Sequence, residues 1–334
     1  MDPSAIPKII HFFVGFLTVL VTKNQWLSSL LFRILMWFKR IKRDVQVKDV
    51  EYEGFKFSYF CRGKPGPQPS VLMLHGFSFN KDMWLDTIKF FPRNVHLICV
   101  DMPGHGETTR LLAESYTAEA QTQRIHQFVE CVGLNKKPFH LVGMSVGGMV
   151  AGLYAAQYPS EVCSLSLLCP AGVQNPRDNE FFSRLRELLR VRDAEGSLVA
   201  TLTMKEEEDL LRLGLHHDTL INVQLLKGYL NDPRPHKIFF LTYFLDVTSE
   251  ESRLSLFNNM SKINVPTQII WGKQDRVFDP PGADILAKAI PDSQLYMLEE
   301  CGHFITLDQP EAAAKLLLHF YTCVYGSPER KKLT

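Results

Sequence analysis

The chain has 334 residues, of which 46% are hydrophobic and 22% are charged, and its formal net charge is +1. This composition is typical of a globular protein with a substantial core, and the near-neutral charge argues against a nucleic-acid partner. There is no P-loop and no cysteine–histidine spacing typical of zinc, so we expect no metal and no cofactor. The seven cysteines are scattered and odd in number, which favours reduced thiols in a reducing compartment.

An apolar run lies near the N-terminus, at residues 9–22 (IIHFFVGFLTVLVT). It is shorter than the roughly 20 residues that usually span a bilayer. The apolar character resumes at 26–32, and no small-residue cleavage site follows the run. We therefore predict a membrane-anchor helix with a basic juxtamembrane segment within residues 1–45. The alternative is an amphipathic helix that lies on the membrane surface.

Basic residues cluster after this run, at Lys39, Arg40, Lys42 and Arg43, whereas Lys8 stands alone before it. The positive-inside rule then places the C-terminal side in the cytosol. We expect an endomembrane (late endosome or lysosome, endoplasmic reticulum or mitochondrion) or the inner face of the plasma membrane. The sequence makes no prediction of the oligomeric state.

From about residue 50, apolar segments alternate with helical segments, which predicts a mostly parallel sheet with helical crossovers. We expect helices at 147–159 and 309–324. The expected strands are an edge strand at 55–60 and further strands within 71–76, 95–106, 139–145, 162–172, 266–272 and 293–303.

Residues 173–262 break this rhythm, because they are helical in pattern, rich in Leu and Phe, and contain no clear buried strand. Such an insertion would cover the carboxyl ends of the strands, where ligands bind in open α/β sheets. We therefore predict a helical lid at 173–262 between two parts of one α/β core, at 46–172 and 263–334. The apolar stretches 210–215 and 237–247 are candidate walls of a tunnel for an acyl chain, or ordinary lid core.

A serine stands between glycines in Gly143-Met144-Ser145-Val146-Gly147. The G-x-S-x-G pattern is typical of a nucleophile elbow, in which a sharp strand-to-helix turn exposes a reactive serine. Glycines at this spacing also mark tight structural turns. The strand predicted before Ser145 and the helix predicted after it favour the elbow, so Ser145 is the candidate nucleophile.

A serine nucleophile needs a base and a residue that orients this base. His303 lies in the turn C-G-H after the last predicted strand and is the candidate base. Weaker candidates are His75, His105, His216 and His217.

The orienting acid should follow a strand end. Asp275 does so in the segment W-G-K-Q-D and is the candidate, with Asp279 and then Asp246 as alternatives. Turn-capping is the ordinary role of an aspartate at such a place.

An oxyanion formed at the site would need two backbone N–H donors. We expect one from Val146, directly after the nucleophile, and one from Phe77 in the H-G-F segment that ends an early strand. The segment D-M-P-G-H-G at 101–106 ends a neighbouring strand. We interpret it as structural, with Asp101 accepting hydrogen bonds from nearby amides and His105 as a candidate pocket residue.

These segments resemble the α/β-hydrolase family over about residues 50–325 and, within it, the membrane-bound monoacylglycerol lipases. The resemblance implies an α/β-hydrolase fold with helices on both faces of the sheet. It also implies the nucleophile, acid and base named above and the same two oxyanion amides. It rests on LMLHGFS, KDMWL, VDMPGHGETTR, RIHQFVECVGLNKKPFHLVG, VPTQIIWGKQD and LEECGH.

The resemblance further implies hydrolysis of monoacylglycerols such as 2-arachidonoylglycerol, with lysophospholipids as further candidates. Met144 and Val146 differ from the Thr and Met that the family pattern leads us to expect, and 173–262 matches least well. Alternatives are an acyltransferase, because His303 and Asp308 fit an H-x-x-x-x-D pattern, and a catalytically silent membrane scaffold. The expected partners are a lipid substrate and a membrane.

Overall fold

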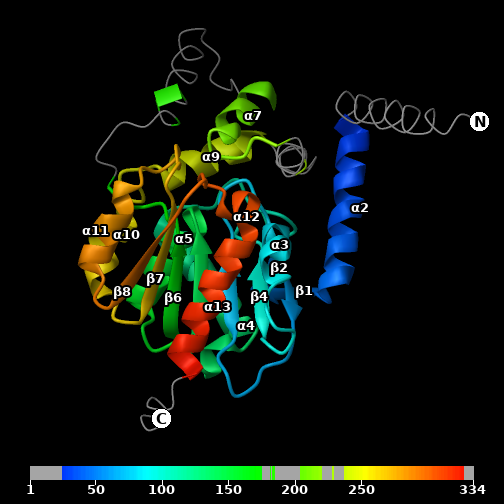
Figure 1. The fold of residues 1–334 in the computed structure, drawn as a ribbon. Helices are drawn as coiled ribbons and strands as arrows, with labels where there is room; N and C mark the ends of the chain where they lie inside the picture. Colours follow the sequence, from blue (N-terminus) through cyan, green and yellow to red (C-terminus); the bar gives the residue numbers. More distant parts are fainter. Residues whose placement is uncertain are drawn as a thin grey trace, which may run out of the picture.

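The computed structural model describes residues 25–174, 204–219 and 237–326, with the single positions 181, 183, 184 and 228. The apolar run at 9–22 lies outside the described residues. An eight-stranded sheet with the order β1-β2-β4-β3-β5-β6-β7-β8 forms the centre of the molecule (Figure 1). Its strands are β1 (Gln46–Tyr52), β2 (Phe55–Arg62), β3 (Val71–Leu74), β4 (Leu97–Val100), β5 (Phe139–Met144), β6 (Val162–Leu168), β7 (Thr267–Gly272) and β8 (Ser293–Leu298).

Strands β3 to β8 pair in parallel, whereas β1 and β2 are antiparallel to their neighbours. The central strands β3, β4 and β5 are buried along their whole length. Such strands read as continuous apolar runs because helices cover both faces of a parallel sheet. The predicted mostly parallel sheet is confirmed.

The prediction of an edge strand at 55–60 is wrong, because β2 pairs with β1 on one side and with β4 on the other. The edge is β1, a polar and mostly exposed strand that the apolar pattern did not reveal. A two-residue turn joins the two strands, with φ of +48° at Glu53 and +84° at Gly54. Positive φ at both positions is the type I′ geometry that suits a tight hairpin.

Helices cover both faces of the sheet (Figure 1). α4 (Ala118–Cys131) packs against α5 (Val146–Gln157) on one face, and α3 (Leu85–Ile88) packs against α13 (Pro310–Gly326) on the other. The predicted helices at 147–159 and 309–324 correspond to α5 and α13. Shorter elements are η1 (Lys81–Trp84), η2 (Leu134–Lys136), η3 (Met260–Lys262), α11 (Pro281–Ala289) and α12 (Ile305–Asp308).

Between β6 and β7, the described residues form helices and no strand. These helices are α7 (Met204–Arg212), α9 (Lys237–Val247) and α10 (Ser255–Asn259), and α7 and α9 lie beyond one end of the sheet (Figure 1). α9 buries Phe239 and Tyr243 in the main core. The domain boundaries at 45, 172 and 262, and the acyl tunnel, stay predictions.

Helix α2 (Gln25–Arg43) contains the apolar segment 26–32 and the basic cluster (Figure 1). Among the residues that the structure describes, no helix combines the length and apolar character needed to cross a membrane. One side chain of α2, Met36, is buried in the core. Its exposed apolar side chains are Leu30, Leu31, Ile34, Leu35, Trp37, Phe38 and Ile41.

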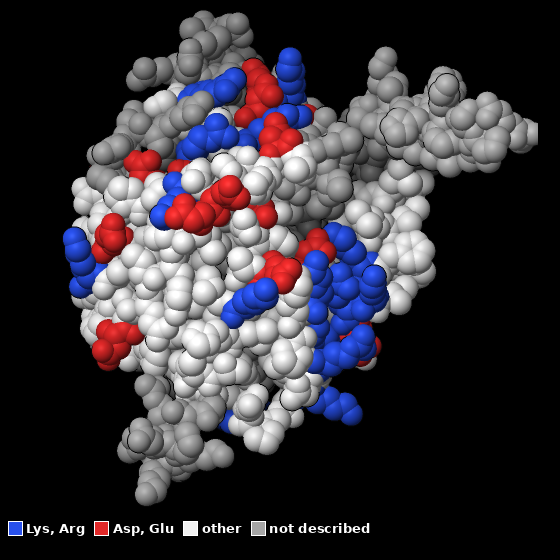
Figure 2. Space-filling model, in the orientation of Figure 1, with Lys and Arg blue, Asp and Glu red and all other residues white. Residues whose placement is uncertain are grey.

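The basic end of α2 contacts residues 82–86 of the α/β core rather than projecting freely. Lys39 pairs with Asp86 at 2.5 Å, and Arg40 donates to both carboxylate oxygens of Asp82 at 2.8 and 2.5 Å. Arg43 donates to the Leu85 carbonyl at 3.2 Å. Figure 2 shows Lys and Arg gathered where α2 meets the rest of the molecule, beside an outer surface of α2 that is neither acidic nor basic.

Candidate active site

Ser145 lies at the turn between β5 and α5 with φ +56° and ψ −122°, a backbone conformation that non-glycine residues rarely adopt. A Cβ at Gly147 would lie 2.4 Å from the His75 carbonyl oxygen and 2.5 Å from that of Leu74. A Cβ at Gly143 would lie 2.2 Å from the Gly147 carbonyl oxygen. The glycines of the motif are therefore required by the close approach of backbone to backbone, and the sharp turn between them is the predicted elbow.

Three side chains from three strand ends meet at this turn. The Ser145 Oγ lies 2.9 Å from His303 Nε2, and His303 Nδ1 lies 2.8 Å from Asp275 Oδ2. All three residues are buried. Asp275 follows β7 and His303 follows β8, so the parallel sheet delivers these groups to one edge although they are far apart in the chain.

The proton positions on His303 follow from its partners. The Asp275 carboxylate is an acceptor, so His303 Nδ1 carries the proton and Nε2 offers its lone pair to Ser145. Asp275 itself is fixed, because its Oδ1 accepts the N–H groups of Val277 at 2.8 Å and Phe278 at 2.9 Å. This arrangement can take a proton from the serine hydroxyl and stabilise the imidazolium that results.

The alternative acids have other positions. Asp246 accepts the Tyr116 N–H at 2.6 Å. Asp279 does not contact His303, and its buried Oδ2 finds no hydrogen-bond partner within the part of the chain that the structure describes. Asp275 alone of the three candidates contacts the base.

The two segments expected to supply amides flank the nucleophile. Val146 is the first residue of α5, and Gly76 lies so near Ser145 that a Cβ there would be 3.1 Å from the serine Cβ. The aromatic ring of Phe77 stacks on Tyr243 of α9, with centroids 5.3 Å apart. Helix α9, which lies within the predicted lid, thus contacts the expected oxyanion loop, defined here as residues 75–78. The donor roles of the Phe77 and Val146 amides stay predictions.

The D-M-P-G-H-G segment braces this loop, as expected from its sequence. Asp101 accepts the N–H groups of Lys81 at 2.7 Å and Glu107 at 2.9 Å. Two buried histidines bridge the segment to the oxyanion loop. His75 Nε2 accepts the Met102 N–H at 2.8 Å, and His105 Nε2 accepts the Ser78 N–H at 3.3 Å.

Burial keeps both histidines neutral. It lowers the pKa of His75 to about 4 and that of His105 to about 3, because the charged ring loses its hydration. Each ring therefore donates through one nitrogen and accepts through the other. His75 Nδ1 donates to the Gly76 carbonyl at 2.7 Å, and His105 Nδ1 donates to the Pro103 carbonyl at 3.0 Å.

A buried ion pair beneath the oxyanion loop was missed by the sequence analysis. Lys81 Nζ lies 2.5 Å from Asp101 Oδ2 and donates to Ser58 Oγ at 3.2 Å, and both charged side chains are shielded from solvent. Burial is the largest single influence and would raise the pKa of the Asp101 carboxyl, but the charge of Lys81 and the hydrogen bonds from Lys81 act together with His75, and the net pKa is lowered. No short motif links positions 81 and 101, so only the fold reveals the pair.

Asp308 was also missed as a structural residue. Its carboxylate accepts the N–H groups of Gly302 at 2.9 Å, His216 at 2.9 Å and His217 at 3.0 Å. Asp308 thus joins the turn that carries His303 to the segment after α7, which lies within the predicted lid.

Cys169 is the third residue whose position the sequence did not reveal. It follows β6, and its Sγ donates to the His303 carbonyl at 3.1 Å. Burial raises the pKa of this thiol well above its ordinary value, so it stays protonated. Among the described residues, Cys169, Asp275 and His303 are the one group whose ligand atoms lie close enough to hold a metal ion. Two of them already bond to each other within the array at Ser145, and all seven cysteines are free of disulfides.

Comparison with known proteins agrees with this geometry. Residues 69–310 match the family described as alpha/beta hydrolase fold. Monoacylglycerol lipase ABHD6 of Bos taurus is 51% identical over 308 residues, which cover 92% of this chain and 91% of the relative. Monoacylglycerol lipase ABHD6 of Homo sapiens is 49% identical with the same coverage.

Among solved structures, a membrane phospholipase A described as a bacterial virulence factor has a TM-score of 0.78. The match covers 96% of this chain and 100% of that chain, at 24% sequence identity, and it supports the fold. The family match and the relatives that are about half identical extend over nearly all of the sheet and the site. This chain therefore belongs to the α/β hydrolase family.

Proposed function

We propose that this protein is a serine hydrolase that cleaves monoacylglycerols to a fatty acid and glycerol. The observation that carries the proposal is the unbroken Ser145–His303–Asp275 array, with distances of 2.9 and 2.8 Å, at the carboxyl edge of the sheet. The substrate class follows from the monoacylglycerol lipases that are 51% and 49% identical over 92% of the chain. We count 2-arachidonoylglycerol among the candidate substrates.

The first half of the reaction forms an acyl-enzyme. Ser145 Oγ attacks the ester carbonyl carbon while His303 Nε2 takes the hydroxyl proton. Asp275 holds the ring in the reactive tautomer and stabilises its positive charge. The imidazolium then returns the proton to the glycerol oxygen as the C–O bond breaks, and glycerol leaves.

The second half uses the same residues. His303 takes a proton from water, whose oxygen attacks the acyl carbon, and Ser145 recovers its proton as the fatty acid departs. In both halves the oxyanion is held by the amides of Val146 and Phe77, assisted by the N-terminus of α5, whose dipole favours negative charge. This cycle uses only groups of the chain and water.

Three alternatives use the same fold. A lysophospholipase would need the same three side chains, so substrate assays must separate the two. An acyltransferase built on H-x-x-x-x-D gains no support, because Asp308 contacts backbone N–H groups while His303 pairs with Asp275. A silent scaffold does not require an intact array.

The test is labelling of the membrane-expressed full chain with a fluorophosphonate, followed on the same samples by fatty-acid release from 1- and 2-monoacylglycerols. Ser145→Ala should lose labelling and release together, whereas Ser166→Ala, a buried serine of β6, should keep both. Lysophospholipids are assayed beside the monoacylglycerols. Labelling with fatty-acid release only from lysophospholipids would show that the protein is a lysophospholipase and would contradict the proposed substrate class. If the folded wild-type protein is not labelled, the proposal that it is a serine hydrolase is contradicted.

We propose further that the N-terminal region attaches the protein to a membrane, with the catalytic domain in the cytosol. Support comes from the exposed apolar side chains of α2, among them Trp37 at 55%, Phe38 at 59% and Ile41 at 58% exposed. A substrate dissolved in the bilayer then reaches the site without exposing its acyl chain to water, which costs about 0.8 kcal/mol per CH₂.

Flotation of the full chain with phosphatidylcholine–phosphatidylserine vesicles tests the role of α2. Trp37→Ser combined with Phe38→Ser should weaken binding, whereas Val47→Ser, an exposed apolar residue on β1, should not. Alkaline carbonate then separates the two modes of attachment. A spanning anchor stays with the membrane, and an interfacial helix is released.

A further inference from the structure

The Gly76–Phe77 peptide is held from one side by His75. Its Nδ1 donates to the Gly76 carbonyl oxygen at 2.7 Å, and its Nε2 accepts the Met102 N–H at 2.8 Å. A carbonyl oxygen only accepts and a backbone N–H only donates, so the two partners fix the tautomer of His75. The ring is buried, so it makes these bonds without competition from water.

This contact fixes the direction of the neighbouring N–H. No described peptide bond is cis, and in a trans peptide the C=O and the following N–H point in opposite directions. When His75 holds the Gly76 oxygen, the Phe77 N–H is directed to the opposite edge of the same peptide. An ordinary glycine-containing loop would let this peptide rotate, because glycine permits many backbone angles.

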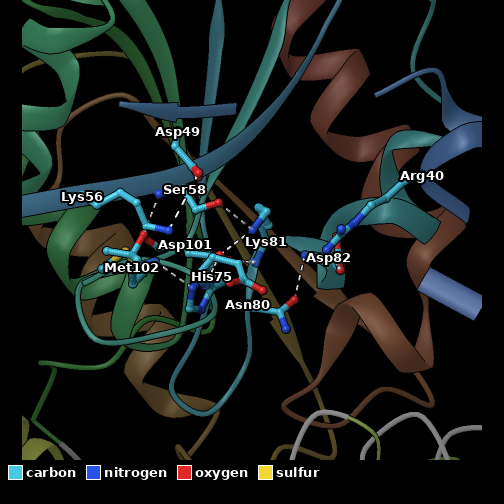
Figure 3. Close-up of polar contacts among 12 residues, drawn as sticks. Arg40, Asp49, Lys56, Ser58, His75, Asn80, Lys81, Asp82, Asp101 and Met102 are labelled. Carbon is cyan, nitrogen blue, oxygen red and sulfur yellow. Dashed lines mark hydrogen bonds and ion pairs between the residues drawn. The ribbon is translucent and has the colours of Figure 1, made fainter. Parts of the chain in front are cut away.

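Met102, the other partner of His75, is itself anchored. It follows Asp101, whose N–H donates to the Ser58 carbonyl at 2.9 Å and whose carboxylate holds both the N–H and the ammonium of Lys81. Figure 3 shows these residues as one connected group, with Lys81 directed at Asp101 and Ser58.

The group extends to helix α2. Asp82 follows Lys81 at the start of η1, and its N–H is capped by the Asn80 side chain at 3.0 Å. Arg40 of α2 grips the Asp82 carboxylate with two parallel hydrogen bonds (Figure 3). Such fork-to-fork pairs fix geometry as well as charge. Asp82 is nearly buried, so Arg40 is the solvent-side end of a polar chain that starts at the oxyanion loop.

We propose that His75 is a positioning residue that aims the Phe77 N–H at the oxyanion, and that Arg40, through Asp82, Lys81 and Asp101, couples the seating of helix α2 to this aim. The proposal rests on the proposed function, because the Phe77 N–H matters only if an oxyanion forms at Ser145. It adds to that function a structural link between helix α2, which we propose meets the membrane, and the peptide N–H group that stabilises the transition state.

Two substitutions of His75 separate its two bonds. His75→Asn keeps a donor near the position of Nδ1, and His75→Gln keeps an acceptor near the position of Nε2. We expect His75→Asn to stay within about threefold of wild-type kcat, and His75→Gln to lose about 100-fold in kcat with little change in KM, as for removal of one oxyanion donor.

The decisive readout is the inhibition constant of an alkyl trifluoromethyl ketone, which forms a tetrahedral adduct with the serine and mimics the transition state. It should weaken by the same factor as kcat/KM, whereas binding of a monoalkylglycerol ether, which cannot be attacked, should not change. A merely structural role would alter both ligands. A His75→Gln enzyme with wild-type kcat, or with lower kcat and an unchanged ketone constant, overturns the role of His75.

Arg40→Ala tests the link to α2, and Arg33→Ala, an exposed arginine on the same helix, is its matched control. We expect Arg40→Ala to lower kcat and ketone affinity together by about threefold to tenfold, and Arg33→Ala to leave both unchanged. If Arg40→Ala and Arg33→Ala have the same kcat and the same ketone affinity, the coupling between α2 and the oxyanion loop is overturned. This comparison does not depend on His75→Gln, so it can be made even if that variant does not fold.

All variants are assayed on 2-oleoylglycerol and on p-nitrophenyl butyrate. A wild type that cleaves only the nitrophenyl ester contradicts the proposed substrate class, and the comparison of ketone affinity with kcat/KM on that ester then judges the positioning proposal separately.

Discussion

The nucleophile elbow and the oxyanion loop face each other across the same reaction centre, yet different forces hold them. At the elbow, Gly143 and Gly147 allow backbones to approach so closely that no side chain fits between them. The oxyanion loop is held in place instead by buried polar groups, namely two neutral histidines and the Lys81–Asp101 ion pair. One half is fixed by shape and the other by hydrogen bonds and charge.

This difference has a physical consequence for how each half fails. Steric contacts between backbones cannot relax without moving a strand or a helix, because protein interiors are close-packed. Buried polar groups are stable only while each has its partner, and removal of one leaves the other uncompensated. Substitutions at the elbow should therefore abolish the backbone geometry that presents Ser145. Substitutions of the polar groups around the oxyanion loop should instead have graded effects on activity and stability.

The largest effect is expected for Gly147→Ala. The added Cβ would meet the carbonyl oxygens of Leu74 and His75 within 2.5 Å, so the elbow must separate from β3. We expect kcat/KM to fall by about 100-fold or more, the scale of a 1 Å misplacement. Steady-state hydrolysis measures this loss, and Gly66→Ala, whose Cβ meets nothing nearer than 3.9 Å, is the control. A Gly147→Ala enzyme of normal activity would show that the elbow is not held by shape.

Lys81→Met comes next, on the opposite side of the comparison. It leaves the Asp101 carboxylate buried without its charged partner, which costs about 3–5 kcal/mol for a broken buried pair. Urea unfolding of the full chain measures the loss. Lys273→Met removes an exposed lysine paired with Glu299, and it should change the free energy of unfolding by less than about 0.5 kcal/mol. Similar results for the two variants would mean that Asp101 finds another partner.

The same contrast explains what the sequence could predict. The elbow can be recognised from a local motif, because G-x-S-x-G between a predicted strand and a predicted helix indicates a sharp turn that carries the nucleophile. His303 and Asp275 follow because each comes directly after an apolar strand. The parallel sheet and its helices could likewise be predicted from the apolar pattern. The edge strand β1 could not, because most of its side chains are polar and face solvent.

The polar half of the site leaves no such signature. Lys81 and Asp101 are 20 positions apart, and Arg40 and Asp82 are 42 apart, with nothing between them that marks a pair. The basic residues of α2 resembled a membrane-facing cluster in the sequence, but three of the four contact the core in the fold. Asp308 matched a catalytic pattern while its carboxylate serves three backbone amides.

Asp308→Ala should have a moderate effect, since it tests whether polar bracing also governs the base. It deprives Gly302, His216 and His217 of the acceptor for their N–H groups. We expect a loss of about 1–3 kcal/mol in the free energy of unfolding, with lower kcat because His303 shares the turn. Thermal unfolding and fatty-acid release measure the two effects, with the exposed Asp284→Ala as control. Full activity would show that the lid contact does not position the base.

The smallest effect concerns acid, and it separates the two halves because the buried His105 bonds to the oxyanion loop, whereas the elbow residues 143–147 include no histidine. The pKa of His105 is lowered to about 3 by burial, while in the unfolded chain it lies near 6.5. Below pH 6.5 the unfolded state binds a proton that the folded state refuses. The stability due to His105 is thus complete above pH 6.5 and is lost as the pH falls toward 3. The slope is about 1.4 kcal/mol per pH unit for one group.

His140 supplies the matched comparison, because burial lowers its pKa to about 3 as well, but it lies at the other end of β5, bonded to Ser164. Urea unfolding between pH 7 and 5 should show a shallower pH dependence for both His105→Asn and His140→Asn. Only His105→Asn should also lower kcat, because only His105 holds the Ser78 N–H beside the reaction centre. If both variants lost activity equally, the polar bracing would belong to the whole sheet rather than to the oxyanion loop. The distinction between a half fixed by shape and a half fixed by polar contacts would then fail.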